Sequence, residues 1–206
     1  MYTPEHFRPD EPTTRQLLSG IHRGNLVTVG DSGLVATFLP AIVDPDVGEH
    51  GALLAHLARN NDQWKSPVSG EALFIADVVD GYVSPSWYAS KAEHGRVVPT
   101  WNYVTVHAYG SLVVHDDPAW VGVLVRRLTE RHEAGRSDPW AVDDAPREFV
   151  EGQLRAIVGV ELRITRLQAK VKMSQNRPPA DVDGVAAAYS REGRPDLADR
   201  VRRATP

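Results

Sequence analysis

The sequence predicts a mainly β protein with added helices, an antiparallel β-barrel that carries its helices at the periphery. Short apolar runs fill the first half of the chain, with Gly, Asp and Ser between them. A longer run alternates with the period of a strand, and segments with helical spacing come after it. The strand–helix–strand rhythm of a doubly wound sheet is missing, which favours the barrel.

The first half of the chain supplies the predicted strands. We expect strands at 26–29, at 34–43 with a break at Pro40, and at 72–79. The segment 48–57 fits a helix and a strand equally well, because its apolar residues follow neither period clearly.

The run from Trp101 to Tyr109 has the clearest strand pattern in the chain. Its odd-numbered positions are mostly aromatic or polar, and its even-numbered positions are mostly small and apolar. Because successive side chains of a strand point to opposite faces, the two sets separate. The first face holds Trp101, Tyr103, Thr105, His107 and Tyr109, and the second holds Asn102, Val104, Val106 and Ala108.

Helices are expected in the second half. Asp117 suits the N-cap of a helix over 118–132, Pro118 suits its first turn, and apolar residues recur there at helical spacing. A helical pattern over 149–157 leads into a strand over 162–173, and short helices at 181–189 and 194–203 complete the chain. With no internal repeat or linker, we expect a single domain over 1–206 with a C-terminal helical segment at about 181–206.

Composition excludes several classes of function. The chain has no Cys, so disulfides, thiolate nucleophiles and zinc–thiolate sites are ruled out. The eight His residues form no metal-ligand pattern, and the phosphate-loop motifs GxGxxG and GxxxxGK[ST] and the hydrolase motif GxSxG are absent. We therefore expect no metal site. Neither a signal peptide nor a run of about 20 apolar residues is present, so we expect a cytoplasmic protein without membrane contact.

The charge balance argues mildly against binding to DNA. The net charge is −4, from 27 acidic and 23 basic residues, whereas binding to DNA rests chiefly on cations. The C-terminal third is the exception, since it is locally basic. Its cations are Arg163, Arg166, Lys170, Lys172 and Arg177, followed by Arg191, Arg194, Arg200, Arg202 and Arg203.

Four clusters, at 56–64, 82–91, 98–103 and 172–177, concentrate the residues that carry chemistry. A phosphorylated planar cofactor needs cations and hydroxyls for its phosphate, flat side chains for its ring and amides for the ring's polar edge. A single aromatic ring of this set could equally lie in the core, and a single cation could equally lie on a solvated face. The inference of a cofactor site therefore rests on their occurrence together. The clusters offer Arg59, Ser86, Ser90, Lys91 and Thr100 for phosphate, Trp87, Tyr88, Trp101 and Tyr103 as rings, and Asn102, Gln175 and Asn176 as amides.

These clusters resemble the PaiB family. The resemblance rests on HLARNNDQW at 56–64, YVSPSWYASK at 82–91, VPTWNYVTVHAYG at 98–110, KMSQNR at 172–177, and MYTP with Phe7 at the N-terminus. It spans nearly the whole chain, and SPSWY, PTWNY and SQNR in this order are its most specific parts. Two departures stand out: Asn61-Asp62 replaces the usual Asn-Pro, and Met173 replaces the usual Leu.

The resemblance implies an FMN-binding split β-barrel, a six-stranded antiparallel Greek-key barrel, that forms a homodimer with the flavin at the subunit interface. It implies FMN as the cofactor, with the turn from Ser86 to Lys91 matching the phosphate-binding stretch of the wider fold. Catalytic residues are not identified. The implied cofactor-binding residues are His56, Arg59, Ser86, Tyr88, Ser90, Lys91, Thr100, Trp101, Asn102, Ser174, Gln175, Asn176 and Arg177.

Three functions follow from the resemblance. The family label is negative transcriptional regulator, although direct DNA contact has little support beyond the Arg-rich C-terminal helix. The alternative is an FMN-dependent oxidoreductase or flavin reductase that uses NAD(P)H, in which Asn102 and Gln175 would tune the ring. A haem-binding split barrel with His56 or His107 on iron is a third reading, less favoured because a lone His in a strand is commonly an ordinary hydrogen-bonded residue.

Overall fold

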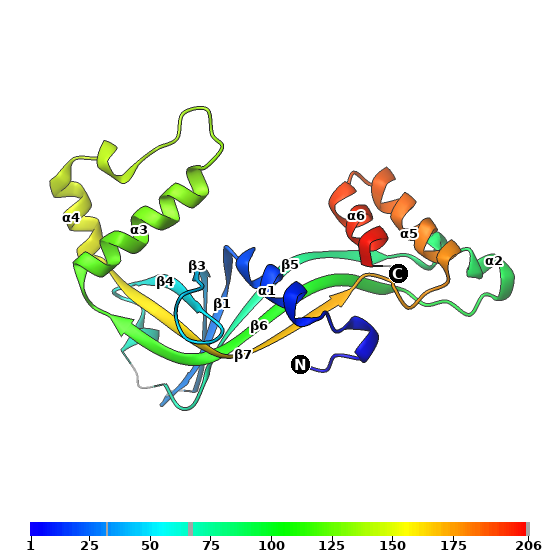
Figure 1. Ribbon diagram of the computed structural model, residues 1–206, viewed down its shortest axis with the longest axis horizontal. Coiled ribbons are helices and arrows are strands. Elements are labelled where there is room, and N and C mark those ends of the chain that lie inside the picture. Colours follow the sequence, from blue (N-terminus) through cyan, green and yellow to red (C-terminus); the bar gives the residue numbers. More distant parts are fainter. Residues whose placement is uncertain (32, 66–67, 205–206) are drawn as a thin grey trace. The chain divides into compact units, whose positions relative to one another are not determined.

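A computed structural model describes residues 1–31, 33–65 and 68–204, and its main feature is a seven-stranded sheet (Figure 1). The strand order is β2-β1-β5-β6-β7-β4-β3. The expectation of a mainly β protein with added helices is confirmed, and the expectation of six strands is wrong. The strands are β1 Arg23–Gly30, β2 Gly33–Pro40, β3 Ile42–Asp44, β4 Ala52–Ala58, β5 Ala72–Val83, β6 Thr100–His115 and β7 Ile157–Lys172.

The additional strand arises at Pro40. Proline has no backbone N–H and cannot donate to the ladder of a sheet. The single run expected at 34–43 therefore divides into β2, which pairs with β1 from Arg23↔Pro40 to Gly30↔Gly33, and the short β3, which pairs with β4. Both pairings are antiparallel, as are those of β1 with β5 and of β4 with β7.

The helices lie mostly in the second half of the chain. The helix α3 follows its expectation closely, and the side chain of Asp117 accepts a hydrogen bond from Ala119 N at 2.9 Å. The helix α4 ends before Ile157, which begins β7 instead of continuing the helical pattern. The helices are α1 Glu11–Ser19, α2 Ser90–His94, α3 Pro118–Glu133, α4 Arg147–Arg155, α5 Pro179–Arg191 and α6 Pro195–Ala204, with 3-10 turns at 5–7, 62–64, 85–87 and 142–144.

The described chain forms two compact units. Unit 1 comprises residues 1–17, 77–106 and 168–206, and unit 2 comprises residues 18–76 and 107–167. The strands β5, β6 and β7 each contribute residues to both units. The expectation of one domain over the whole chain stays a prediction.

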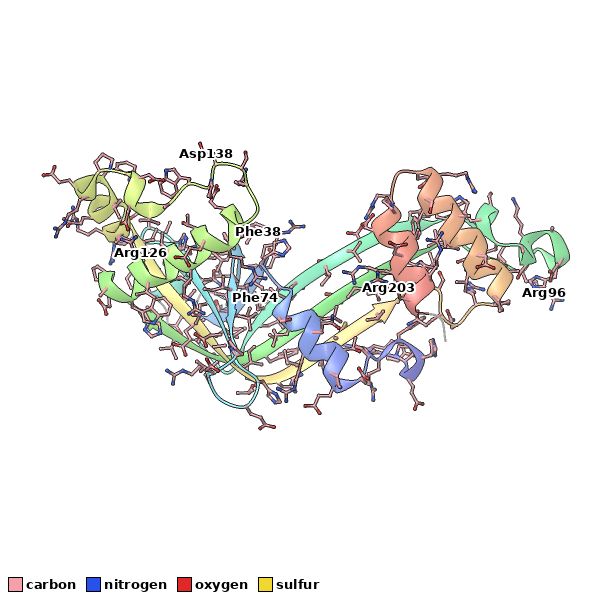
Figure 2. The ribbon with its side chains drawn as sticks, turned by 45° about the horizontal axis from the view of Figure 1, so that its top comes forward. Phe38, Phe74, Arg96, Arg126, Asp138 and Arg203 are labelled. Carbon is pink, nitrogen blue, oxygen red and sulfur yellow. The ribbon has the colours of Figure 1, made fainter. Side chains whose placement is uncertain are left out.

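Unit 2 holds β1 to β4 with α3 and α4. Phe74 on β5 is 2% exposed, and a Cβ atom at Gly24 of β1 would lie 2.3 Å from its ring, so only Gly fits there. Phe38 on β2, at one end of the strand order, is 61% exposed; both phenylalanines are labelled in Figure 2. A second apolar cluster joins α3 to β3 and β4 through Ile42, Ala52, Leu54, Leu124 and Leu128.

The ambiguous segment 48–57 covers most of the strand β4. Ala52, Leu53, Leu54 and Ala55 are all buried, so both faces of the strand are covered. A strand buried on both faces has a continuous apolar run without alternation. This explains why the spacing of its apolar residues did not distinguish a strand from a helix.

Unit 1 has its own core beneath the helical hairpin of α5 and α6. Tyr189 of α5 and Leu197 of α6 are buried, and the Tyr189 hydroxyl donates to Gly81 O at 3.0 Å. The strand residues Val83, Val104 and Met173 belong to the same cluster. Among the residues that the structure describes, no helix combines the length and apolar character that a membrane crossing needs.

The contact between β6 and β7 at Gly110 gives a test of strand packing. A Cβ atom at Gly110 would lie 1.9 Å from the carbonyl oxygen of Arg163, which belongs to the backbone and has little room to move. We expect Gly110→Ala to lower the free energy of unfolding by about 1–3 kcal/mol, measured by urea denaturation. As a control, Gly152→Ala on α4 adds a methyl group to open space and should raise that free energy by about 0.5–1 kcal/mol. If Gly110→Ala left the free energy of unfolding unchanged, the two strands would not approach this closely.

Candidate functional site

The first strand of the site is β6. Its expected alternation is confirmed in unit 1, where Asn102 and Val104 are 1% exposed and Trp101 is 53% exposed. The Trp101 ring meets Tyr82 of β5 edge to face, with centroids 6.1 Å apart, and Tyr82 is 46% exposed. Two aromatic side chains therefore stand together at the surface of unit 1.

The turn that ends β7 joins this strand. Ser174 adopts a left-handed conformation with φ 63°, is 4% exposed, and donates its hydroxyl to Asn102 Oδ1 at 3.1 Å. Gln175 donates Nε2 to Val171 O at 2.6 Å and accepts from Met173 N at 2.7 Å, so its side chain closes the turn. The structure thus brings Asn102 and Ser174 together and uses both ends of the Gln175 amide inside the protein.

Lys172 links β7 to the start of β6. Its ammonium group donates to Thr100 Oγ1 at 2.6 Å and to the carbonyl oxygen of Trp101. Burial lowers the pKa of Lys172, and the nearby cations Lys170 and Arg177 lower it further. Arg177 lies over the ring of Tyr88, 4.8 Å from its centroid.

The turn from Ser84 to Lys91 contains two different environments. Ser86 and Lys91 are exposed, and Lys91 Nζ donates to Ser86 Oγ at 3.3 Å. Ser90 is 8% exposed, and its N–H and hydroxyl donate to the two carboxylate oxygens of Asp181 on α5 at 2.9 and 2.7 Å. Asp181 is 1% exposed. To bind a phosphate, Ser90 would have to give up both of its hydrogen bonds to this buried carboxylate.

The two rings of this turn are engaged in the core. Tyr88 is 3% exposed, and burial raises the pKa of its hydroxyl. Trp87 meets Tyr189 edge to face at 5.3 Å, and a Cβ atom at Gly184 would lie 2.1 Å from the carbonyl oxygen of Trp87. Both rings pack against α5, whereas Trp101 and Tyr82 are exposed.

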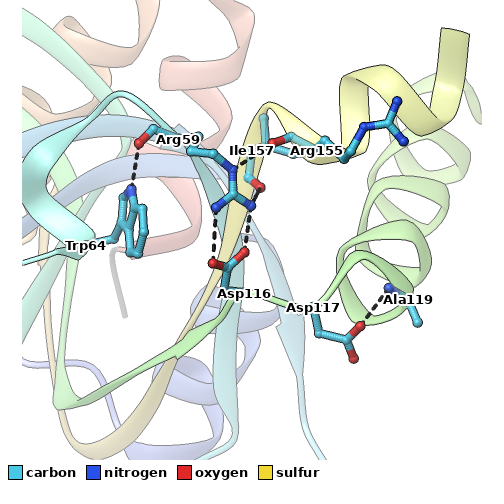
Figure 3. Close-up of polar contacts among 7 residues, drawn as sticks. All are labelled: Arg59, Trp64, Asp116, Asp117, Ala119, Arg155 and Ile157. Atoms are coloured by element: carbon cyan, nitrogen blue, oxygen red, sulfur yellow. Dashed lines mark hydrogen bonds and ion pairs between the residues drawn. The ribbon is translucent and has the colours of Figure 1, made fainter.

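His56 and Arg59 belong to unit 2, whereas the other eleven expected site residues belong to unit 1. Arg59 forms a bidentate pair with Asp116, at 3.0 and 2.5 Å, and donates to Arg155 O at 2.6 Å (Figure 3). Its own carbonyl oxygen accepts from Trp64 Nε1 at 3.0 Å. Arg59 thus links the ends of β4, β6 and α4. His56 is half-buried, and burial lowers its pKa.

Three residues of the site were not among the expected cofactor-binding residues: Lys170 and Lys172, which the sequence marked only as part of a basic C-terminal third, and Asp181. The two lysines carried a readable signal, because positions two apart on a strand share a face. Asp181 carried none, since its partner Ser90 lies 91 residues away in the chain.

The buried pair of Ser90 and Asp181 predicts a stability effect. Asp181→Ala leaves two buried donors of Ser90 without an acceptor, which should cost about 2–4 kcal/mol of the free energy of unfolding. Asp183→Ala is the control, because Asp183 lies on the same helix and is exposed. Urea denaturation of both variants measures the difference, and equal stabilities would show that the pair contributes nothing.

The pair of Arg59 and Asp116 predicts a pH effect. The hydrogen bond from Arg59 lowers the pKa of Asp116 below its ordinary 3.8. A depressed carboxyl pKa stabilises the fold at neutral pH, and this stability is lost as the pH falls through the folded-state pKa. We therefore expect Asp116→Asn to lower Tm at pH 7, and the gap from wild type to shrink as the pH falls below 3.8. Asp138→Asn, at an exposed site, should show no gap at any pH; a gap for Asp116→Asn that persists in acid would contradict the prediction.

The sequence of the chain is similar to those of known proteins. Residues 1–166 match the family model described as "Putative FMN-binding domain". The protease synthase and sporulation protein PAI 2 of Bacillus subtilis is 29% identical over 205 residues, which cover 95% of this chain and 92% of the relative. An uncharacterised protein of Aspergillus fumigatus is 34% identical over 176 residues, covering 69% of this chain and 67% of the relative.

Solved structures share the fold. The conserved hypothetical protein Rv2991 of Mycobacterium tuberculosis superposes with a TM-score of 0.58 at 13% identity, covering 86% of this chain and 94% of that chain. The FAD and haem binding protein of Mycobacterium smegmatis gives a TM-score of 0.54 at 20% identity, covering 82% and 74%. The resemblance to the PaiB family is confirmed, and the chain belongs to this FMN-binding domain family, with FMN as its cofactor.

Proposed function

We propose that this protein binds FMN with the phosphate at the turn from Ser84 to Lys91 and the ring beside the surface of Trp101 and Tyr82. We further propose that the sheet is a split barrel of Greek-key topology and that the protein is a cytoplasmic homodimer with the flavin at the subunit interface. Family membership supports the cofactor, and the likeness to Rv2991 and to the FAD and haem binding protein supports the barrel.

The observation that carries the phosphate assignment is the exposed pair of Lys91 and Ser86. Within the described chain Lys91 has the Ser86 hydroxyl as its partner and forms no ion pair with a carboxylate. A phosphate placed here can accept a charge-assisted hydrogen bond from the ammonium group and a second one from the hydroxyl. The ammonium group does not first have to leave a carboxylate. Arg59, by contrast, would have to leave Asp116 to do the same.

The amide side chains suit positioning. Asn102 accepts from Ser174, and Gln175 binds the backbone on both sides of the turn. These bonds hold the turn that leads into Asn176 and Arg177. Both ends of the Gln175 amide are engaged in these bonds, so we assign Gln175 the shaping of the site. Asn102 shapes it through Oδ1, and its Nδ2 group, buried without a hydrogen-bond partner in the described chain, remains a donor for the polar edge of the ring.

We propose a regulatory role as the second candidate function; the Bacillus relative is named for protease synthesis and sporulation. Direct DNA contact through α6 gains little from the contacts there. Arg194 pairs with Asp196 at 3.0 Å, and Arg202 pairs with Asp199 at 3.2 Å. Arg194 precedes α6, and paired arginines offer less to a phosphate backbone, so direct DNA contact through this helix would rest on Arg200 and Arg203.

Removing the cation of the proposed phosphate turn tests the FMN site. We expect the protein to titrate one FMN per chain, and Lys91→Ala to weaken FMN about tenfold or more while changing riboflavin little, because only FMN carries the phosphate. Arg96→Ala is the matched control, since Arg96 is an exposed cation in the same segment without a proposed contact. Quenching of flavin fluorescence gives all the dissociation constants. Equal losses for both flavins would show that the turn does not hold the phosphate.

A further inference from the structure

Three cations gather where β7 ends: Lys170, Lys172 and Arg177. Lys170 and Lys172 are two positions apart on the strand and so share a face, and Arg177 follows the turn at Ser174. All three lie in unit 1 and outside the residues that the family model matches. They lie close enough for both Lys170 and Arg177 to lower the pKa of Lys172.

The partners of these cations carry no negative charge. Lys170 donates to Tyr2 O at 3.2 Å, Lys172 donates to Thr100 Oγ1 and Trp101 O, and Arg177 lies over Tyr88. In the described part of the chain, none of the three forms an ion pair with a carboxylate. Partly buried like charges without an anion repel one another and lose hydration. Such a group is stabilised by an anion that comes from outside the chain.

Lys170 also has a structural role. Its ammonium group lies 5.8 Å from the ring of Tyr2, 5.9 Å from Phe7 and 5.4 Å from Tyr103, distances at which an ammonium group is attracted to an aromatic face. These contacts hold the N-terminal segment on β7, together with the bond from Met1 N to Gln168 Oε1 at 2.6 Å. They explain Lys170 without a ligand, so the case for a ligand rests on the other two cations.

Lys172 and Arg177 have donors left over. An ammonium group has three donors, and Lys172 uses two of them, on Thr100 and Trp101. The planar fork of a guanidinium suits two oxygens of one anion, and the ring of Tyr88 supports it from one side. The hydroxyl of Thr100, which accepts from Lys172, can itself donate to the same anion.

We propose that Lys172 and Arg177, with Thr100 beside them and Lys170 adding charge, form a binding site for the phosphate group of a small molecule. A phosphate monoester carries about two negative charges at pH 7, which match a group of three cations better than the single charge of a carboxylate. The phosphate belongs either to FMN or to a second phosphorylated molecule that binds beside the flavin. The first source rests on the proposed binding of FMN, but it places the phosphate at Lys172 and Arg177 in place of the turn at Lys91. The second source leaves the phosphate of FMN at the turn.

The test compares three variants with the wild type. Lys172→Met removes the charge and keeps most of the length of the side chain, and Lys172→Arg keeps the charge. Lys65→Met is the control, since Lys65 is an exposed cation of unit 2 that pairs with Asp62 at 2.7 Å. For each protein we would measure the dissociation constants of FMN and riboflavin, and the rise in Tm on adding orthophosphate against chloride at equal ionic strength, with and without flavin.

Two outcomes support the proposal and identify the source of the phosphate. If Lys172→Met weakens FMN about tenfold or more and leaves riboflavin unchanged, the phosphate of FMN occupies the site. If the affinity for FMN is unchanged, but orthophosphate raises the Tm of the FMN-loaded wild type and not of Lys172→Met, a second phosphorylated molecule occupies it. In both cases Lys172→Arg should retain most of the effect.

The proposal is overturned if Lys172→Met changes neither the preference for FMN over riboflavin nor the response to orthophosphate. Far-UV circular dichroism checks that the variant folds, and Arg177→Met provides the same comparison if it does not. Should neither flavin bind to the wild type, the proposed function fails, while the orthophosphate response of the flavin-free protein still decides whether this site exists.

Discussion

The candidate site depends on the left-handed turn at Ser174. A non-glycine residue with φ 63° is strained unless its surroundings hold it, and here the Ser174 hydroxyl bonds to Asn102 while the Gln175 side chain closes the backbone on both sides. The turn directs the chain from β7 toward α5. Lys172, just before the turn, lies against Thr100, and Arg177, just after it, lies over Tyr88. Residues from three separate sequence motifs thus meet in one region of unit 1.

Much of the fold could be predicted wherever one face of an element is buried and the other is exposed. The alternation of β6 and the spacing and cap of α3 are periodic signals of that kind, and both were correct. The strand β4 has no such signal, because it is covered on both faces. The helix α2 is only five residues long, too short for a helical period to show, and it was not expected.

The site was predictable to the extent that its residues fall in compact motifs. Eleven of the thirteen expected residues do lie in one unit, but their partners could not be predicted. Asp116 lies 57 residues from Arg59, and Asp181 lies 91 residues from Ser90. The type of a residue does not reveal whether a carboxylate distant in the sequence already accepts its hydrogen bonds. A cation or hydroxyl with such a partner has a structural role, whereas one without it can bind a ligand.

This distinction locates the anion-binding capacity of the protein. A cation already paired with a carboxylate must lose that partner before it gains a phosphate, so its net contribution to binding is small. Arg59, Arg194 and Arg202 are paired in this way. Lys91, Lys172 and Arg177 have only hydroxyl, carbonyl or ring partners in the described chain, so each gains a full charge-assisted bond from an incoming anion. All three belong to unit 1, which therefore holds both proposed phosphate sites as well as the exposed ring of Trp101.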